Sequence, residues 1–265
     1  MGQPMAATSH SHCTPPNNQS LHAVLTHTSG TEQLQQLLTS NNITVSHIPV
    51  MSISPLSIST IKQTALHEAD AWIFLSRHSL GHNTKLLQDA RTDQTVIAIG
   101  SGTAEALLSH ELVVDYIPTS HSSQGIIEHP FFNSDNTYKV LIFSELSSPS
   151  PLKKALNKRG HQAIQIATYR QQPRCTCELA SALSPIIDQS THITAHSQRG
   201  LEHIIATIHT EKLDALLAKM LVVTNQSMQT YAYQKGFQSV ICSANNGAAE
   251  ILDTIKQHGV GATHG

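Results

Sequence analysis

Charged and aromatic side chains are scarce in this 265-residue sequence: Asp, Glu, Lys and Arg make up 13% of it, and Phe, Trp and Tyr 4%. Lys and Arg number 16 and Asp and Glu 18, for a net charge of −2, with no long run of either sign. The sequence therefore lacks the basic patch expected of proteins that bind nucleic acid or anionic lipid, and we expect neither as a partner. Hydrophobic residues at 39% still indicate a globular chain.

Long apolar runs are also missing. No stretch reaches the length of a membrane-spanning helix, and residues 1–20, MGQPMAATSHSHCTPPNNQS, lack the apolar core of a signal peptide. We therefore expect a cytoplasmic protein that does not associate with membranes, with residues 1–21 forming a flexible polar leader.

Cysteines are few and irregularly spaced, at Cys13, Cys175, Cys177 and Cys242. The Cys175-Thr176-Cys177 spacing fits neither a zinc motif nor a thioredoxin-type motif, so we expect reduced thiols.

Nucleotide and metal motifs are absent or weak. No glycine-rich dinucleotide fingerprint follows the first apolar run, and no Walker-type loop occurs. The 18 histidines raise the question of a metal, with His10-Ser11-His12-Cys13 and the pair His192 and His196 as nearest candidates. The first set lies in the leader, and the second spans a predicted strand end, where residues i and i+4 do not share a face. We expect no metal site.

Short apolar runs alternate with helix-like patterns along the chain. The predicted strands cover residues 22–26, 43–50, 71–75, 95–99, 113–117, 139–143, 163–169, 192–195, 220–223 and 239–242. A helix is predicted from Pro151 to Lys158, with Gly160 just beyond its end. About ten strands are too many for one typical sheet but natural for two. Strands joined by helical crossovers predict parallel sheets and an α/β fold class.

Two segments resemble each other and hint at an internal duplication. Residues 74–80 (FLSRHSL) and 195–201 (AHSQRGL) both place a serine just after a predicted strand. Serine is also a common helix N-cap, so coincidence explains the pattern equally well.

Several motifs in order resemble the uroporphyrinogen-III synthase family, from about Val24 to Ile255. They are WIFLS at residues 72–76, IAIGSGTA at 97–104, and Arg159-Gly160 followed by ATYR at 167–170 and Pro173. The resemblance implies two similar flavodoxin-like parallel-sheet domains with a cleft between them. It implies a discontinuous domain 1 of residues 22–50 plus 175–265 and a domain 2 of residues 51–174. A two-stranded linker would join them near residues 49–52 and 169–171.

The resemblance also implies the reaction. Members of this family cyclise hydroxymethylbilane, a linear tetrapyrrole, to uroporphyrinogen III, with inversion of ring D and loss of water. No metal or organic cofactor is implied, and hydroxymethylbilane synthase is the expected transient partner. We expect a monomer.

Tyr169 is the catalytic residue that the resemblance implies, since it matches the family's tyrosine near the departing hydroxyl, to which a phenol can donate a proton. It is alternatively a packed strand tyrosine. The substrate is a polycarboxylate and the protein has no basic excess, so helix N-termini after the strands are the expected anion-binding groups. The candidate substrate-binding residues are Ser76, Gly100, Ser101, Gly102, Thr103, Ser197 and Ser227. Plain N-capping is the alternative role for each hydroxyl.

The chain departs from the family pattern at three places. Residues 26–28 replace a basic residue and a proline, residues 144–149 lack the arginines often found there, and residues 224–227 lack a glycine-threonine pattern. Four histidines could replace the lost cations if they are protonated: His27, His78, His82 and His196. This hypothesis predicts activity that falls above neutral pH.

Two other functions stay open from the residues alone. A family member with impaired catalysis would keep the fold and the cleft. A two-domain protein that binds a small molecule without catalysis would do the same.

Overall fold

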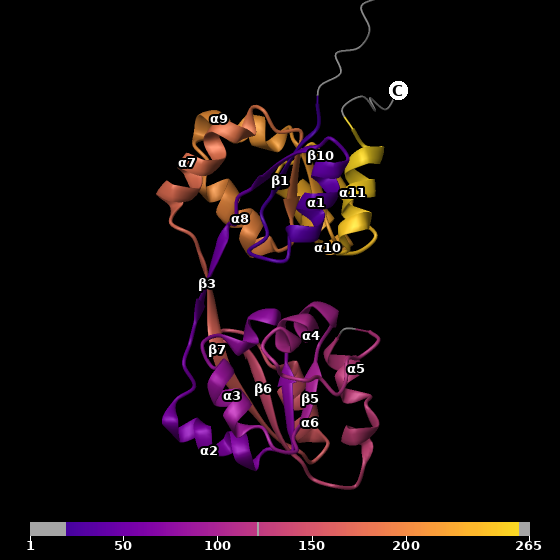
Figure 1. Ribbon diagram of the computed structural model, residues 1–265. Coiled ribbons are helices and arrows are strands. Elements are labelled where there is room, and N and C mark those ends of the chain that lie inside the picture. Colours follow the sequence, from indigo (N-terminus) through magenta and orange to yellow (C-terminus); the bar gives the residue numbers. More distant parts are fainter. Residues whose placement is uncertain (1–19, 121, 260–265) are drawn as a thin grey trace, which may run out of the picture.

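The computed structural model describes residues 20–120 and 122–259 and has two five-stranded sheets, each covered by helices (Figure 1). The α/β fold class with two predominantly parallel sheets is confirmed. The predicted leader lies almost entirely outside the described residues.

Sheet A takes strands from both ends of the chain. It contains β1 (His22–Leu25), β2 (Thr44–His47), β8 (His192–Ala195), β9 (Met220–Val223) and β10 (Ser239–Cys242), all parallel, in the order β10-β9-β8-β1-β2. This is the flavodoxin-like order, in which the chain reverses its direction of winding after the second strand.

Successive side chains along the strands of sheet A point to opposite faces of the sheet, where they pack into two separate cores. Ala23 and Leu25 pack with α1 (Glu32–Ser40) and α11 (Ala248–Gln257). Val24 instead packs with the opposite helices, which are α7 (Thr176–Ile187), α8 (Gln198–Thr207), α9 (Thr210–Leu217) and α10 (Gln226–Gln234). All four residues of β1 are buried, as expected of a central parallel strand.

Sheet B is built from the middle of the chain. It contains β3 (Met51–Pro55), β4 (Ala71–Phe74), β5 (Thr95–Ala98), β6 (Lys139–Glu145) and β7 (Gln162–Pro173), in the order β3-β7-β6-β4-β5. Its four parallel strands follow the same winding as sheet A, and only β3 is antiparallel.

The two faces of sheet B are likewise covered by helices. Trp72 and Phe74 face a core with α2 (Thr60–Glu68), α3 (Thr84–Ala90) and α4 (Ser101–Leu108). Ile73 faces a core with α5 (Ser123–Ile127) and α6 (Pro151–Lys158). Two short 3₁₀ helices, η1 (Arg77–Leu80) and η2 (Pro130–Asn133), complete the structure. The predicted helix from Pro151 to Lys158 is confirmed.

An antiparallel ladder of β3 and the end of β7 connects the two sheets (Figure 1). Its register runs from Met51 opposite Pro173 to Pro55 opposite Tyr169. The domain boundaries given above, residues 22–50 plus 175–265 and 51–174, stay a prediction. Below, sheet A with its helices is called the sheet A domain, and sheet B with its helices the sheet B domain.

The predicted strand over residues 113–117 is wrong. Only Tyr116 forms an isolated bridge, with Ile97. The Asp115 carboxylate accepts a hydrogen bond from the Val96 amide (2.7 Å) and so occupies a position that a strand backbone would fill. The side chain of Val113 is 58% exposed, so the segment also lacks the burial that holds a strand in a sheet.

The internal duplication stays a prediction, since both sheets share one winding, but the two serine segments do not occupy matching positions in them. Residues 74–80 follow β4, the first parallel strand of sheet B, whereas residues 195–201 follow β8, the third strand of sheet A. Both serines are N-caps: the hydroxyl of Ser76 accepts from the His78 amide, and that of Ser197 accepts from the Gly200 amide. Capping chemistry therefore explains the similarity.

Gly81 is the position in the sheet B domain where a side chain is least tolerable. Its backbone has φ +54° and ψ −130°, and an added Cβ would lie 2.6 Å from the carbonyl oxygen of Thr168. We expect Gly81→Ala to lower the free energy of unfolding by about 3 kcal/mol or more, because strained backbone and a backbone collision act together. Urea unfolding followed by circular dichroism measures this.

The control is Gly160→Ala. Gly160 also has a positive φ (+91°), but nothing lies within 4 Å of an added Cβ. Its expected cost is only about 1–2 kcal/mol. Equal losses for the two variants would contradict the steric argument.

Candidate active site

Each sheet has a point where the direction of winding reverses, between β1 and β8 in sheet A and between β4 and β6 in sheet B. In open α/β sheets, ligands bind outside the carboxyl ends of the strands at this point. Pockets lie at both, and all three are lined by residues of both domains. We call the space formed by these three pockets, of about 240, 340 and 280 Å³, the interdomain cleft.

In the sheet A domain, a buried threonine pair fixes the strand ends at the reversal point. The hydroxyl of Thr26 donates to the carbonyl of Thr194 (2.6 Å), and the hydroxyl of Thr194 accepts from the Thr26 amide (3.3 Å). A pocket of about 240 Å³ opens beside it and is closed on one side by Met51 and Gln171 of the ladder.

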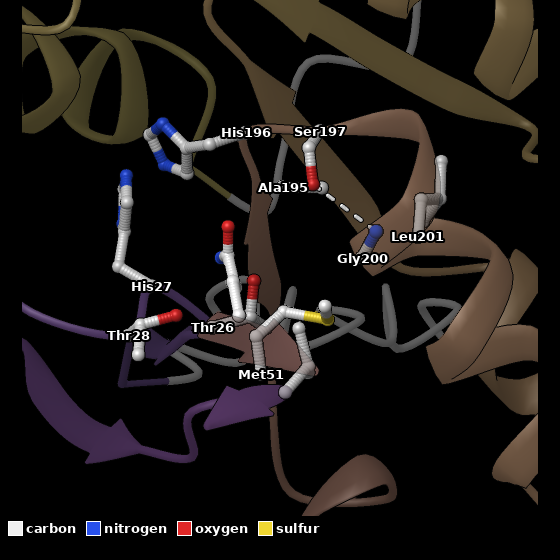
Figure 2. Close-up of a pocket in the computed structure, with 11 residues that line it drawn as sticks. Thr26, His27, Thr28, Met51, Ala195, His196, Ser197, Gly200 and Leu201 are labelled. Carbon is white, nitrogen blue, oxygen red and sulfur yellow. Dashed lines mark hydrogen bonds between the residues drawn. The ribbon is translucent and has the colours of Figure 1, made fainter. Parts of the chain in front are cut away.

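Two histidines face each other at this pocket. Figure 2 shows the rings of His27, which follows β1, and His196, which follows β8, turned toward one another, and their centroids are 3.0 Å apart. Among the described residues, His27 Nδ1 and His196 Nε2 are buried without a hydrogen-bond partner. The pair therefore has unused hydrogen-bonding capacity at the pocket.

Burial determines the charge of this pair. It lowers the pKa of His27 to about 4, with the nearby His47 as a smaller cause. Burial likewise lowers the pKa of His196 to about 3, with His27 adding to the effect. Both imidazoles are therefore neutral near pH 7.

The hypothesis that protonated histidines replace the missing cations is therefore wrong for these two residues. It is also wrong for His78, whose pKa is lowered by burial and, second, by the charge of Arg77. His82 is exposed and does not line the described pockets. Some other group must supply positive charge.

In the sheet B domain, the predicted binding residues gather at one pocket. Ser76 follows β4, and a second group follows β5 at the start of α4: Gly100, Ser101, Gly102 and Thr103. No side chain caps α4, whose N-cap residue is Gly100. The first amides of this helix are thus available to an anion.

Arg77 completes this pocket and was not among the predicted residues. Its guanidinium lies between the two domains, because an added Cβ would be 2.9 Å from it at Gly30 and 2.6 Å from it at Gly102. Among the described residues it forms no ion pair. The Ser29 hydroxyl and His78 Nε2 bridge the domains beside it, 2.8 Å apart.

Tyr169 lies on β7 at the same edge of sheet B and is 9% exposed. Burial raises the pKa of its phenol, the Ser76 hydroxyl opposes this, and the Glu145 carboxylate adds to it. The ring of His78 lies 5.7 Å from the tyrosine ring. Tyr169 is therefore protonated at neutral pH, the state required of a proton donor.

The other two predicted hydroxyls lie apart from this group. Ser197 lines the pocket beside the histidine pair, where Figure 2 shows its bond to the Gly200 amide (3.1 Å). Ser227 is exposed in the first turn of α10 and lines none of the described pockets. The N-cap of α10 is Asn225, which accepts from the Met228 amide (2.9 Å).

Within residues 20–120 and 122–259, no cluster of three or more His, Cys, Asp or Glu side chains has the arrangement of a metal site. His192 is buried and bonds to the Thr191 hydroxyl through Nδ1 (2.8 Å). The candidate at residues 10–13 lies outside the described residues. In the same part of the chain, none of the helices has the length and apolar character to span a bilayer.

Comparisons with known proteins identify one family and a shared fold. The family model for uroporphyrinogen-III synthase HemD matches residues 32–253. No curated protein sequence matches the chain. The uroporphyrinogen-III synthetase structure from Helicobacter pylori has a TM-score of 0.61 at 13% identity, over 89% of this chain and 99% of that one. A mutant uroporphyrinogen III synthase from Thermus thermophilus has a TM-score of 0.56 at 13% identity, over 90% and 98%. These two structural matches establish a shared fold.

The lowered pKa values of the histidine pair predict acid sensitivity. The unfolded chain binds protons near the ordinary pKa of 6.5, whereas the folded protein binds them at His27 and His196 only near 4 and 3. The contribution of these two residues to the free energy of unfolding is therefore complete above about pH 6.5. It is lost as the pH falls from there toward the pKa values of about 4 and about 3 in the folded protein. We expect His196→Gln to reduce the loss between pH 7 and 4 by on the order of 1–2 kcal/mol.

Urea unfolding at each pH provides the measurement. The control is His209→Gln, which changes an exposed histidine outside the pockets. An identical pH dependence for His196→Gln and the wild type would refute the assignment.

Proposed function

The chain belongs to the uroporphyrinogen-III synthase family, and we propose that its reaction takes place in the interdomain cleft. The protein is accordingly a cyclising lyase of tetrapyrrole and haem biosynthesis, which converts hydroxymethylbilane to uroporphyrinogen III with inversion of ring D and loss of water. The observation that carries the placement is Tyr169, a buried and protonated phenol on β7, one strand from the reversal point of sheet B, whose partner Ser76 lines the pocket of Arg77.

Substrate carboxylates bind where the sheet B domain offers positive charge. Arg77 supplies a full charge, and the uncapped start of α4 supplies amides at Ser101 and Gly102. A guanidinium can hold a carboxylate with two parallel hydrogen bonds. Because Gly30 and Gly102 carry no side chains, the guanidinium can lie against both of them, and there it lines both pockets that a substrate would enter.

The phenol of Tyr169 donates a proton to the departing hydroxyl. The electron push comes from the substrate's pyrrole nitrogens, so the protein has to assist the leaving group and to hold the chain in a folding that favours the inverted closure. The neutral pair of His27 and His196 on the opposite wall offers hydrogen bonds without adding charge. Ser197 offers a hydroxyl there.

The proposal includes the cellular location and the oligomeric state of the protein. We place it in the cytoplasm as a monomer, with hydroxymethylbilane synthase as a transient source of substrate. Cys175, Cys177 and Cys242 are free thiols, as is usual in a reducing compartment. Size-exclusion chromatography with light scattering measures the oligomeric state.

Product analysis tests the function. Purified protein is given freshly generated hydroxymethylbilane, and the oxidised products are separated into type I and type III uroporphyrins. We expect mainly type III from the wild type. Tyr169→Phe is expected to lower kcat by about 10²-fold or more, because it removes only the proton donor.

Type I alone, the spontaneous isomer, would instead indicate a family member with impaired catalysis or a binding protein of the same fold. A wild-type rate for Tyr169→Phe, together with type III product, would remove Tyr169 from the chemistry but leave the function in place.

Arg77→Gln tests the anion site. Loss of a charge-assisted hydrogen bond costs about 1.5–3 kcal/mol, so kcat/KM should fall by about 10- to 100-fold, mainly through KM. Arg91→Gln is the control, since Arg91 pairs with Asp115 near the opposite ends of the strands. An unchanged KM for Arg77→Gln would place the substrate carboxylates elsewhere.

A further inference from the structure

Glu145 is an unpaired carboxylate at the reversal point of sheet B. It is the last residue of β6, where the pairing of β6 with β7 shifts register so that Glu145 lies opposite Tyr169. Its Oε1 atom is buried and has no hydrogen-bond partner among the described residues. No ion pair to Glu145 occurs in that part of the chain either.

Backbone contacts hold Glu145 next to the tyrosine. The amide of Leu146, the following residue, donates to the carbonyl of Tyr169 (2.9 Å). The two side chains interact as well, since the negative charge of Glu145 is one of the causes that raise the pKa of the Tyr169 phenol. The carboxylate therefore shares the surroundings of the proposed proton donor.

A buried carboxylate oxygen without a partner is costly, and such an oxygen is usually paired with a positive group. Glu145 also lies at the carboxyl end of β6, at the edge of the sheet where the proposed site for a polycarboxylate lies, and like charges repel each other. A negative charge at this place is favourable only toward a part of the substrate that is, or becomes, positive. The pyrrole N–H groups are weakly positive in the ground state, and loss of hydroxide creates a full positive charge.

We propose that Glu145 is a catalytic residue that stabilises the cation formed when the substrate loses its hydroxyl group. This inference rests on the proposed function of Tyr169 and adds the charge that acts beside it. A carboxylate fixed where charge develops lowers the barrier most when water is excluded.

The step balances without an oxidant or another reactant. The C–O bond of the hydroxymethyl group breaks, its electron pair leaves with oxygen, and the phenol proton of Tyr169 converts it to water. An azafulvenium cation and a tyrosinate remain, with Glu145 unchanged and negative beside the cation. Attack on this cation by the substituted carbon of ring D forms a C–C bond and gives a spiro intermediate. The older C–C bond to that carbon then breaks and a new one forms at the free carbon of ring D, which inverts the ring. That carbon loses one proton, which restores the phenol.

Glu145→Gln removes the charge and keeps the shape. We expect kcat to fall by about 10- to 100-fold, while KM stays the same or decreases because repulsion of the carboxylates is relieved. Glu145→Asp keeps the charge and should retain more activity than Glu145→Gln. Glu211→Gln, on the exposed side of α9, is the matched control and should leave both constants unchanged.

A second readout does not depend on turnover. NMR titration of ring-labelled tyrosine, with Tyr169→Phe used to assign the signal, should show that Glu145→Gln lowers the pKa of Tyr169. An unchanged kcat in Glu145→Gln, with or without a lower KM, would overturn the proposal if the wild type makes type III product. Only type I product from the wild type would instead refute the proposed function, and the titration would still report whether the two side chains interact.

Discussion

The antiparallel pairing of β3 with the end of β7 is the constraint on which the cleft depends. Within residues 20–120 and 122–259, the chain passes between the sheets only at these two segments, and each is a single extended strand. The register runs from Met51 opposite Pro173 to Pro55 opposite Tyr169, and one more backbone hydrogen bond lies beyond each end, from the Leu56 amide to the Thr168 carbonyl (2.7 Å) and from the Arg174 amide to the Val50 carbonyl (3.1 Å). This short ladder keeps the carboxyl ends of both sheets close enough to share pockets.

The distribution of charge across the cleft is uneven. The wall of the sheet A domain carries two imidazoles that burial keeps neutral. The wall of the sheet B domain carries Arg77 and the uncapped start of α4, and the Glu145 carboxylate lies at the neighbouring end of β6. A protein with a net charge of −2 can hold a polyanion in this way, because the few positive groups are concentrated where the substrate lies.

Strand and helix patterns predicted most of the fold, because buried parallel strands such as β4 and β6 are continuous apolar runs. The wrong strand at residues 113–117 has the same apolar pattern, and the hydrogen bond of the Asp115 carboxylate and the exposure of Val113 distinguish it in the structure. Strand ends likewise predicted Ser76 and the start of α4. Arg77 lies within the segment FLSRHSL, but its sequence context does not distinguish it from an arginine on the protein surface. Its role depends on Gly30 and Gly102, which come from distant segments of the chain.

The residues that no local pattern could find are those whose roles depend on pairs across the fold. His27 and His196 meet only because β1 and β8 are neighbours in sheet A, and their neutrality follows from burial. In the sequence, Glu145 belongs to residues 144–149, which lack the arginines often found there in the family. In the structure the same residue lies beside Tyr169, and its charge there opposes ionisation of the phenol. The departure from the family pattern thus removes a cation from one position and supplies an anion at the place where the reaction generates positive charge.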